Sequence, residues 1–260
     1  MAAAGRAPCL GGLVGRSFAR RVLFAPLAHL VACICGTRPV PMATITRLLD
    51  GHIRFRQDYF EHSRELFEAL ASGGQNPTAL FIGCCDSRVV PHLITSAQPG
   101  DLFVLRNIAN VVPRYEEGVT FNRSVGAAIE YAVHVLRVPH IIVCGHTICG
   151  GLGALLAGPE TLDRDTPTLA GWLRDAAAVL DRLRRRDLDG EALARQLVFE
   201  NVVLQLENIL TYPVVTRALD EDRVELHGWV YDLADGSMTV FDPQTNEFKP
   251  LEKVLAAPAR

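Results

Sequence analysis

Two short apolar runs that end in glycine constrain the fold of this 260-residue chain more than any other feature of its sequence. The first run, Ala79–Ile82, ends at Gly83, and the second, His140–Cys144, ends at Gly145. Short runs without polar alternation are typical of strands that are buried on both faces of a parallel sheet. We therefore expect the two strands to lie side by side, so that the residues after both glycines meet at one edge of the sheet.

Side chains that bind metals or carry charge follow both glycines. Cys84, Asp86 and Arg88 occupy alternate positions after the first strand, and His146 and Cys149 follow the second. Taken alone, His146 or Cys149 is more often a core residue than a ligand, and Asp86 with Arg88 can be a plain structural ion pair. Two thiolates and an imidazole at one sheet edge, however, suit zinc better than iron or magnesium. The sequence thus predicts a zinc site made by Cys84, His146 and Cys149.

Three protein ligands leave the fourth tetrahedral position of zinc open, which indicates a catalytic site rather than a structural one. Two thiolates weaken zinc as a Lewis acid, so we expect neighbouring groups to assist a water bound there. Asp86 is placed to accept a hydrogen bond from a zinc-bound hydroxide, and Arg88 can hold Asp86 by a two-pronged hydrogen bond. Without Arg88, the carboxylate can swing onto the metal and fill the open position.

Strand and helix patterns alternate along the chain and predict an α/β fold, with a mostly parallel central sheet flanked by helices and an N-terminal helical arm. Apolar spacing predicts one or two amphipathic helices from Met42 to Leu70. The remaining expected elements are strands at Ala79–Gly83, Leu102–Leu105 and His140–Cys144, a helix from Phe121 to Leu136, two helices between Pro167 and Leu210 joined near Gly190, and strands at Val224–Tyr231 and Met238–Phe241 separated by a turn at Asp235-Gly236.

Residues 1–41 differ in composition from the rest, and we expect residues 42–260 to form a single domain. The leader has five arginines but no lysine or acidic residue. Two arginines before the apolar segment Val22–Ile34 resemble an export signal, the composition resembles a transit peptide, and the residues before Cys33 resemble a lipoprotein processing site. A proline and a histidine interrupt the apolar segment, and Met42 opens a conventional helical pattern. We expect the leader to be a non-core extension that is disordered, processed or never translated, and the protein to be cytoplasmic, with export or an organelle as the alternative.

Charge and cysteine usage narrow the classes of partner. From Met42 onward the chain carries 21 basic and 29 acidic side chains, a formal charge of −8, which argues against nucleic acid. No apolar stretch reaches the roughly 18 residues of a membrane span. The four cysteines of this part lie at the ends of apolar strands, in a chain too large to need disulfide staples, which indicates a reducing compartment.

The motif Cys-x-Asp-Ser-Arg from Cys84 to Arg88, followed about 60 residues later by Gly-His-x-x-Cys-Gly-Gly, resembles the β-class carbonic anhydrases. The resemblance extends from Ile45 to Leu251 and is greatest to the plant-type and cyanate-operon-type branch. It implies reversible hydration of carbon dioxide to bicarbonate and a proton, by a zinc-bound hydroxide that an Asp-Arg dyad orients. It also implies one zinc ion per subunit and a homodimer or higher homo-oligomer.

The resemblance assigns roles to further residues. Gln75 matches the amide that hydrogen-bonds substrate, and Phe103, Ile108 and Tyr131 match the apolar walls of the carbon dioxide pocket, which come largely from the neighbouring subunit in this family. Gly150 begins a segment whose helical N–H groups suit an anion such as bicarbonate. The same family pattern makes Cys84, His146 and Cys149 the zinc ligands, and Asp86 and Arg88 the dyad.

Two alternatives remain open from the sequence: a carbonyl sulfide or carbon disulfide hydrolase on the same scaffold, and a catalytically silent zinc-binding homologue. The intact amide and dyad argue against the silent homologue. Phe81 stands where an allosterically regulated branch has a tryptophan of its non-catalytic bicarbonate site, so that regulation is not expected here. We expect Cys85 and Cys144 to be buried packing residues.

Overall fold

The structure, a computed structural model, describes residues 42–118, 123–158, 162, 165–183, 188 and 190–256. The predicted leader and the predicted helix start at Phe121 lie outside these residues. The chain divides into two compact units between Gly73 and Gly74.

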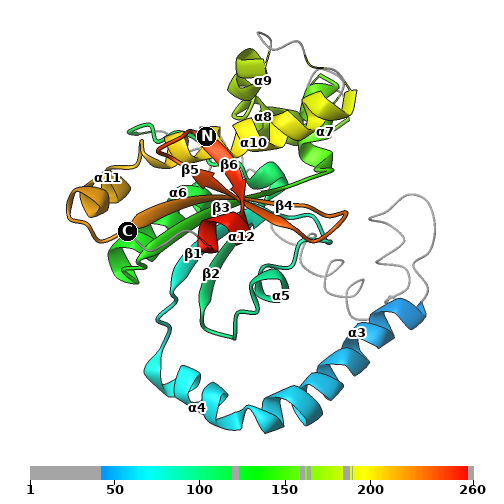
Figure 1. The fold of residues 1–260 in the computed structure, drawn as a ribbon. Helices are drawn as coiled ribbons and strands as arrows, with labels where there is room; N and C mark the ends of the chain where they lie inside the picture. The colour runs from blue at the N-terminus through cyan, green and yellow to red at the C-terminus, as the bar shows by residue number, and fades with distance from the viewer. Residues whose placement is uncertain are drawn as a thin grey trace, which may run out of the picture. The chain divides into compact units, whose positions relative to one another are not determined.

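The first unit is helical, as the sequence predicted. Its elements are α3 (Met42–Arg54), the π-helical turn η1 (Phe55–Phe60) and α4 (Arg64–Gly73) (Figure 1). Aromatic rings pack within it at centroid separations of 4.7 to 6.3 Å and come from Phe55, Tyr59, Phe60 and Phe67. These ring contacts join η1 to Phe67 of α4.

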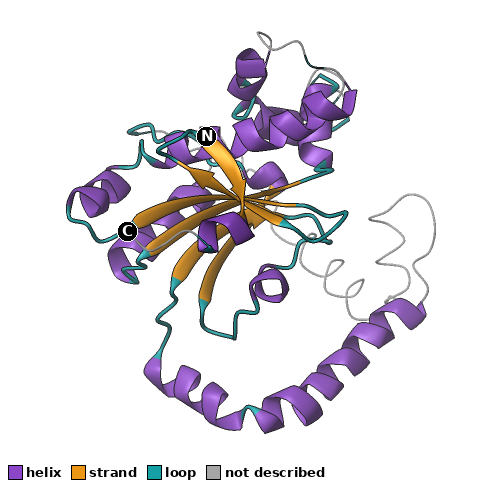
Figure 2. Cartoon of the chain, viewed as in Figure 1, coloured by secondary structure: helices purple, strands orange, loops and turns teal. Residues whose placement is uncertain are grey.

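A six-stranded sheet in the order β2-β1-β3-β4-β5-β6 is the centre of the second unit (Figure 2). The strands are β1 (Ala79–Cys84), β2 (Leu102–Asn107), β3 (His140–His146), β4 (Glu225–Tyr231), β5 (Met238–Asp242) and β6 (Glu247–Pro250). The first four are parallel to one another, β5 is antiparallel to β4, and β6 is antiparallel to β5. The predicted α/β fold with a mostly parallel sheet and the predicted pairing of β1 with β3 are confirmed; β6 was not predicted.

Helices flank the sheet. They are α5 (Pro91–Thr95), the short turn η2 (Ile108–Asn110), α6 (Arg123–Glu130) continued by η3 (Tyr131–Val135), α7 (Gly150–Leu156), α8 (Pro167–Arg174), α9 (Ala178–Leu183), α10 (Gly190–Ile209), α11 (Pro213–Asp220) and α12 (Leu251–Leu255). The two helices expected between Pro167 and Leu210 are in fact three, because the first pattern breaks after Arg174. Helices α5, α11 and α12 were not predicted; α5 and α12 have five residues each, too few to show a repeated apolar period.

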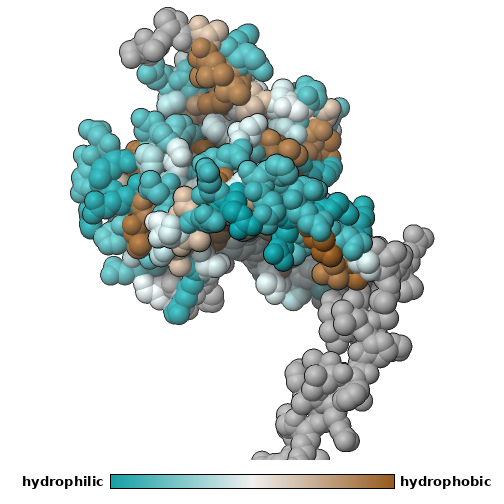
Figure 3. All heavy atoms as spheres, turned by 90° about the horizontal axis from the view of Figure 1, so that it is seen from below, coloured by the Kyte–Doolittle hydropathy of each residue, from teal (hydrophilic) through white to brown (hydrophobic). Residues whose placement is uncertain are grey.

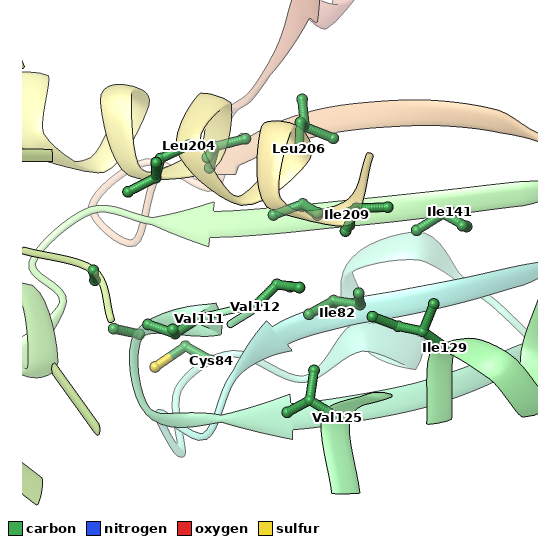
Figure 4. Packing of buried hydrophobic residues seen from close by; sticks show 14 of the residues in the cluster. Ile82, Cys84, Val111, Val112, Val125, Ile129, Ile141, Leu204, Leu206 and Ile209 are labelled. Carbon is green, nitrogen blue, oxygen red and sulfur yellow. The ribbon is translucent and has the colours of Figure 1, made fainter. Parts of the chain in front are cut away.

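Side chains of the parallel strands alternate between two apolar layers. Leu80 and Ile82 of β1 lie in one apolar cluster with buried residues of α6 and α10. Figure 4 shows Ile82 close to Ile129 and Ile209 in this layer. A smaller layer on the other face contains Ala79, Phe81, Ile142 and Cys144. Both faces of β1 and β3 are therefore dry, as expected for continuous apolar runs.

A buried amide network joins α10 to the chain after β2. Gln205 accepts a hydrogen bond from the Val112 N–H (2.8 Å), and Asn208 donates to the Val112 carbonyl (2.8 Å). Asn201 donates to the Ala109 carbonyl (3.1 Å) and accepts from Gln205 (2.8 Å). These bonds hold the backbone at residues 109–112, which lies beside the candidate metal ligands described below.

The face of the molecule in Figure 3 is mostly hydrophilic and carries separate hydrophobic patches. Within the described part of the chain, no helix combines the length and the apolar character that crossing a membrane requires.

Replacing Gln205 with leucine tests the amide network. We expect Gln205→Leu to lower the free energy of unfolding by about 2 to 4 kcal/mol, because the buried Val112 N–H and the Asn201 carbonyl oxygen lose their partners. Urea unfolding at one fixed protein concentration measures the change. Gln196→Leu on the same helix is the matched control and should cost less than 1 kcal/mol; equal losses in the two variants would contradict the role of the network.

Candidate active site

Cys84 ends β1 and begins the first loop of the site. Its side chain is 4% exposed, and its sulfur accepts a hydrogen bond from the Asp86 N–H (3.4 Å). Arg106 of β2 donates to the carbonyl oxygens of Cys84 (2.8 Å) and Asp86 (2.7 Å). One guanidinium thus fixes the backbone on both sides of Cys85, so the loop keeps one shape.

His146 ends β3 and begins the second loop. Ile148 has φ of 57°, in the left-handed region that β-branched residues rarely adopt, and its side chain is exposed. This strained turn lets Cys149 return toward His146 before α7 begins. Gly151 then passes against η2: a Cβ at this position would lie 2.8 Å from Cγ2 of Ile108, so only glycine permits the approach.

The two loops bring Cys84, His146 and Cys149 together, as predicted. Their ligand atoms all lie within 4.8 Å of one another, and the two sulfurs are 4.0 Å apart. Nδ1 of His146 donates to the Thr147 carbonyl (2.9 Å), which leaves the lone pair on Nε2. That Nε2 is buried and has no hydrogen-bond partner among the described residues. Two sulfurs and an unpartnered imidazole nitrogen at this separation fit a tetrahedral metal ion.

The two thiols ionise as a coupled pair. The pKa of Cys84 is lowered to about 4, first because Cys149 donates a hydrogen bond to it and further because of His146 and backbone N–H groups. The pKa of Cys149 is raised by the same hydrogen bond and by burial, and the N–H groups of Leu152 and Gly151 oppose the rise. A divalent cation offsets the repulsion between two thiolates and so permits both to ionise.

Asp86 and Arg88 form the two-pronged contact that the sequence predicted. Arg88 donates from Nε to Oδ1 (2.9 Å), from Nη2 to Oδ2 (2.8 Å) and from its backbone N–H to Oδ1 (3.0 Å). These hydrogen bonds hold the pKa of Asp86 well below its usual range. Oδ2 lies 3.9 Å from Nε2 of His146. Asp86 is therefore an ionised acceptor beside Cys84, His146 and Cys149, the three candidate ligands that are called the metal group below.

Three further contacts were not predicted. The Arg88 guanidinium also donates to the Ile148 carbonyl (3.0 Å), so it joins the two loops. No sequence motif indicated the two contacts of Arg106 with backbone carbonyls. Thr147 donates from Oγ1 to Asp232 (3.1 Å) at the end of β4, which anchors the second loop. Such contacts join distant positions through single side chains, so periodicity does not reveal them.

The residues expected to bind substrate are spread over the second unit. Ile108 lies against Gly151, next to the metal group, and Gly150 is exposed at the start of α7. The rings of Phe103 and Tyr131 stack at 5.8 Å, but Phe103 pairs with Leu80, four residues and about 13 Å before Cys84 on the strand.

Gln75 is exposed and makes no hydrogen bond among the described residues. The structure of one chain thus brings Ile108 and Gly150 to the metal group, and leaves Phe103, Tyr131 and Gln75 without contact to it.

The prediction for Cys85 was wrong, whereas that for Cys144 is confirmed. Cys85 is exposed, because β1 ends at Cys84 and strand alternation no longer applies to the next residue. Cys144 is buried in the smaller apolar layer, and burial raises the pKa of its thiol to about 12.

Comparison with known proteins identifies the family to which the chain belongs. A family profile described as carbonic anhydrase matches residues 79–238. A carbonic anhydrase of Pseudomonas aeruginosa is 44% identical over 207 residues, which cover 78% of this chain and 90% of that protein.

Solved structures agree. The β-carbonic anhydrase CcaA superposes with a TM-score of 0.74 at 40% identity, over 80% of this chain and 92% of that one. A structure described as one of two tetrameric β-carbonic anhydrases from Sordaria macrospora gives a TM-score of 0.64 at 30% identity, over 80% and 97%. The chain therefore belongs to the carbonic anhydrase family, within its β class, and is an enzyme of that family.

Proposed function

We propose that this enzyme hydrates carbon dioxide reversibly to bicarbonate and a proton at a zinc ion held by Cys84, His146 and Cys149. The observation that carries the proposal is the buried, unpartnered Nε2 of His146 close to two thiol sulfurs, with an ionised carboxylate 3.9 Å away. Soft sulfur ligands with one imidazole favour zinc over magnesium or calcium. When bound, zinc lowers the pKa of a coordinated water to about 7, so that a nucleophile is present near neutral pH.

Asp86 orients the attacking group. Because its carboxylate is ionised, it can only accept hydrogen bonds, and so it fixes the proton of the nucleophile and directs a lone pair at the carbon of the substrate. Arg88 occupies both carboxylate oxygens and holds Asp86 away from the ligand atoms. The bridge from Arg88 to the Ile148 carbonyl keeps this orientation fixed relative to both ligand loops.

The proposed substrate residues complete the site. Ile108 supplies an apolar wall for carbon dioxide, and Gly150 leaves room and a backbone N–H for the product anion. We assign Gln75, Phe103 and Tyr131 to the substrate pocket of a neighbouring subunit, since in their own chain they do not contact the metal group.

A homo-oligomer follows from this assignment. The solved relative described as tetrameric supports it. So does an apolar row of exposed side chains on α3, which consists of Ile45, Leu48, Leu49 and Ile53. We propose a homodimer or a larger assembly of dimers.

Stopped-flow hydration of carbon dioxide by the full chain, with zinc measured on the same sample, tests the proposed function. We expect fast turnover with about one zinc per catalytic site, falling as the pH is lowered through the pKa of the nucleophile. Full zinc content with no turnover between pH 6 and 9, or faster turnover of carbonyl sulfide than of carbon dioxide, would refute the proposal.

Loss of one thiolate should remove the metal. We expect Cys149→Ser to lose most of the zinc at this site and most of the hydration activity, because a hydroxyl is a far weaker ligand than a thiolate. Metal analysis after gel filtration and stopped-flow kinetics measure both effects. The exposed neighbour Cys85 offers a matched control: Cys85→Ser should keep zinc and activity, and a Cys149→Ser enzyme with full zinc would remove Cys149 from the ligand set.

Loss of the Asp86 charge should affect turnover and leave the metal in place. We expect Asp86→Asn to retain zinc and to lower kcat at least about tenfold, because an amide can donate to the nucleophile and no longer fixes its proton. Asp242→Asn makes the same chemical change in an ion pair with Lys249 on another strand and should leave kcat unchanged. Equal kcat in the Asp86→Asn variant and the wild type would show that the dyad is only structural.

Arg106 is proposed as a positioning residue for the first loop. Because a glutamine cannot reach both carbonyl oxygens, Arg106→Gln should lower kcat several-fold at unchanged zinc content. Arg106→Lys should recover part of the loss, whereas the surface control Arg223→Gln should have no effect. Zinc loss in parallel with activity would mean that Arg106 supports the ligands themselves and not the orientation of Asp86.

A further inference from the structure

A second group of metal-binding side chains lies at the amino ends of the strands, opposite the catalytic site. His140 is the first residue of β3, and Glu225 and His227 are the first and third residues of β4. On β3, His146 is the sixth residue after His140, a distance of about 20 Å along the strand. This second group is therefore independent of the catalytic ligands.

The three ligand atoms form a triangle of suitable size. Nδ1 of His140 and Nε2 of His227 are 3.2 Å apart, and each lies 3.7 Å from Oε2 of Glu225. Around a tetrahedral zinc ion with ligand bonds of about 2.0 to 2.1 Å, neighbouring ligand atoms are about 3.3 Å apart. The side chains thus stand close to ligand geometry before any ion binds.

The backbone fixes this arrangement. His140 pairs in register with Glu225, and Ile142 pairs with His227, so all three ligands point to the same face of the sheet. The Glu225 N–H donates to the Pro139 carbonyl (2.9 Å), which extends the pairing past the start of β3. Ligands on paired strands lose little conformational freedom when they bind, and a site of this kind is preorganised.

The exposure of the three side chains is also suitable. The side chains of His140 and His227 are 38% and 30% exposed, and that of Glu225 is 73% exposed, so an ion can reach all three and keep a water ligand.

We propose that His140, Glu225 and His227 form a second metal site, which binds zinc or a similar divalent transition metal with water as the remaining ligand. Metal binding replaces the hydrogen bond between the two imidazoles, and the proton of that bond moves to the other ring nitrogen of the same histidine. It joins the starts of β3 and β4, and because it lies about 20 Å from the catalytic ligands, it stabilises the sheet and takes no part in the hydration reaction.

Equilibrium dialysis of the full chain against zinc chloride at buffered free concentrations tests this site. We expect about two zinc ions per wild-type chain, of which Cys149→Ser removes the catalytic one and Glu225→Gln the second. His140→Gln should act like Glu225→Gln, and each should weaken the second zinc at least about tenfold at unchanged carbon dioxide hydration. The thermal midpoint should rise with zinc beyond the first equivalent only where all three ligands are intact.

Two controls make the outcome specific. His134→Gln and Glu247→Gln remove an imidazole and a carboxylate elsewhere in the second unit, and both variants should still bind the second zinc. If the wild type binds no second zinc, or Glu225→Gln binds it as the wild type does, then the group is only a hydrogen-bonded imidazole pair and the inference is overturned. Failure of the catalytic proposal is distinguishable, because it would appear as unchanged zinc binding in Cys149→Ser.

Discussion

The parallel pairing of β1 with β3 is the interaction on which the catalytic site depends. The register places Gly83 opposite Cys144, so that β3 ends at His146, one residue beyond the level at which β1 ends at Cys84. Alternation puts Cys84 on the face of Leu80 and Ile82, and His146 on the opposite face, so a metal ion can reach both only beyond the strand ends. A slip of one residue would move every side chain of a strand to the other face. The dry packing on both faces forbids such a slip, since it would place side chains of different size in each layer.

Beyond the strand ends, hydrogen bonds rather than apolar packing hold the two ligand loops in place. Arg88 and Arg106 each bind carbonyl oxygens of loop residues, and Arg88 also neutralises Asp86. The strained backbone at Ile148 and the close passage of Gly151 would be costly in isolation. They persist because hydrogen bonds fix the surroundings: Asn201 of α10 donates to the carbonyl of Ala109, which Gly151 passes, and Thr147 donates to Asp232 just after β4. The stability of the core thus offsets the strain in the two loops, and the candidate ligands and the carboxylate of Asp86 are held in place before substrate binds.

The sequence was sufficient for the features that depend on local patterns or on residue chemistry. Apolar runs predicted β1, β2 and β3, and the residue types after two glycines predicted which side chains meet. The sequence was insufficient for features whose conformation depends on contacts between residues far apart in the chain. Cys85 was predicted to be buried because the sequence does not locate the end of β1 to one residue. The hydrogen bonds from Arg106 to the carbonyls of Cys84 and Asp86 depend on the pairing of β1 with β2. Short elements such as β6 take their conformation from their neighbours, and an apolar period cannot reveal them.

The two ends of β3 show how one strand can serve two separate purposes. Loops after the carboxyl ends of parallel strands are free to vary, and they carry the chemistry in folds of this class. At the amino ends, the register is set where the strands begin, as in the pairing of His140 with Glu225. A metal ion at His140, Glu225 and His227 would join two adjacent strands where no loop of the catalytic site begins. Its free energy of binding would therefore strengthen the β3–β4 pairing and, through the common register, the alignment of β3 with β1 on which the catalytic ligands depend.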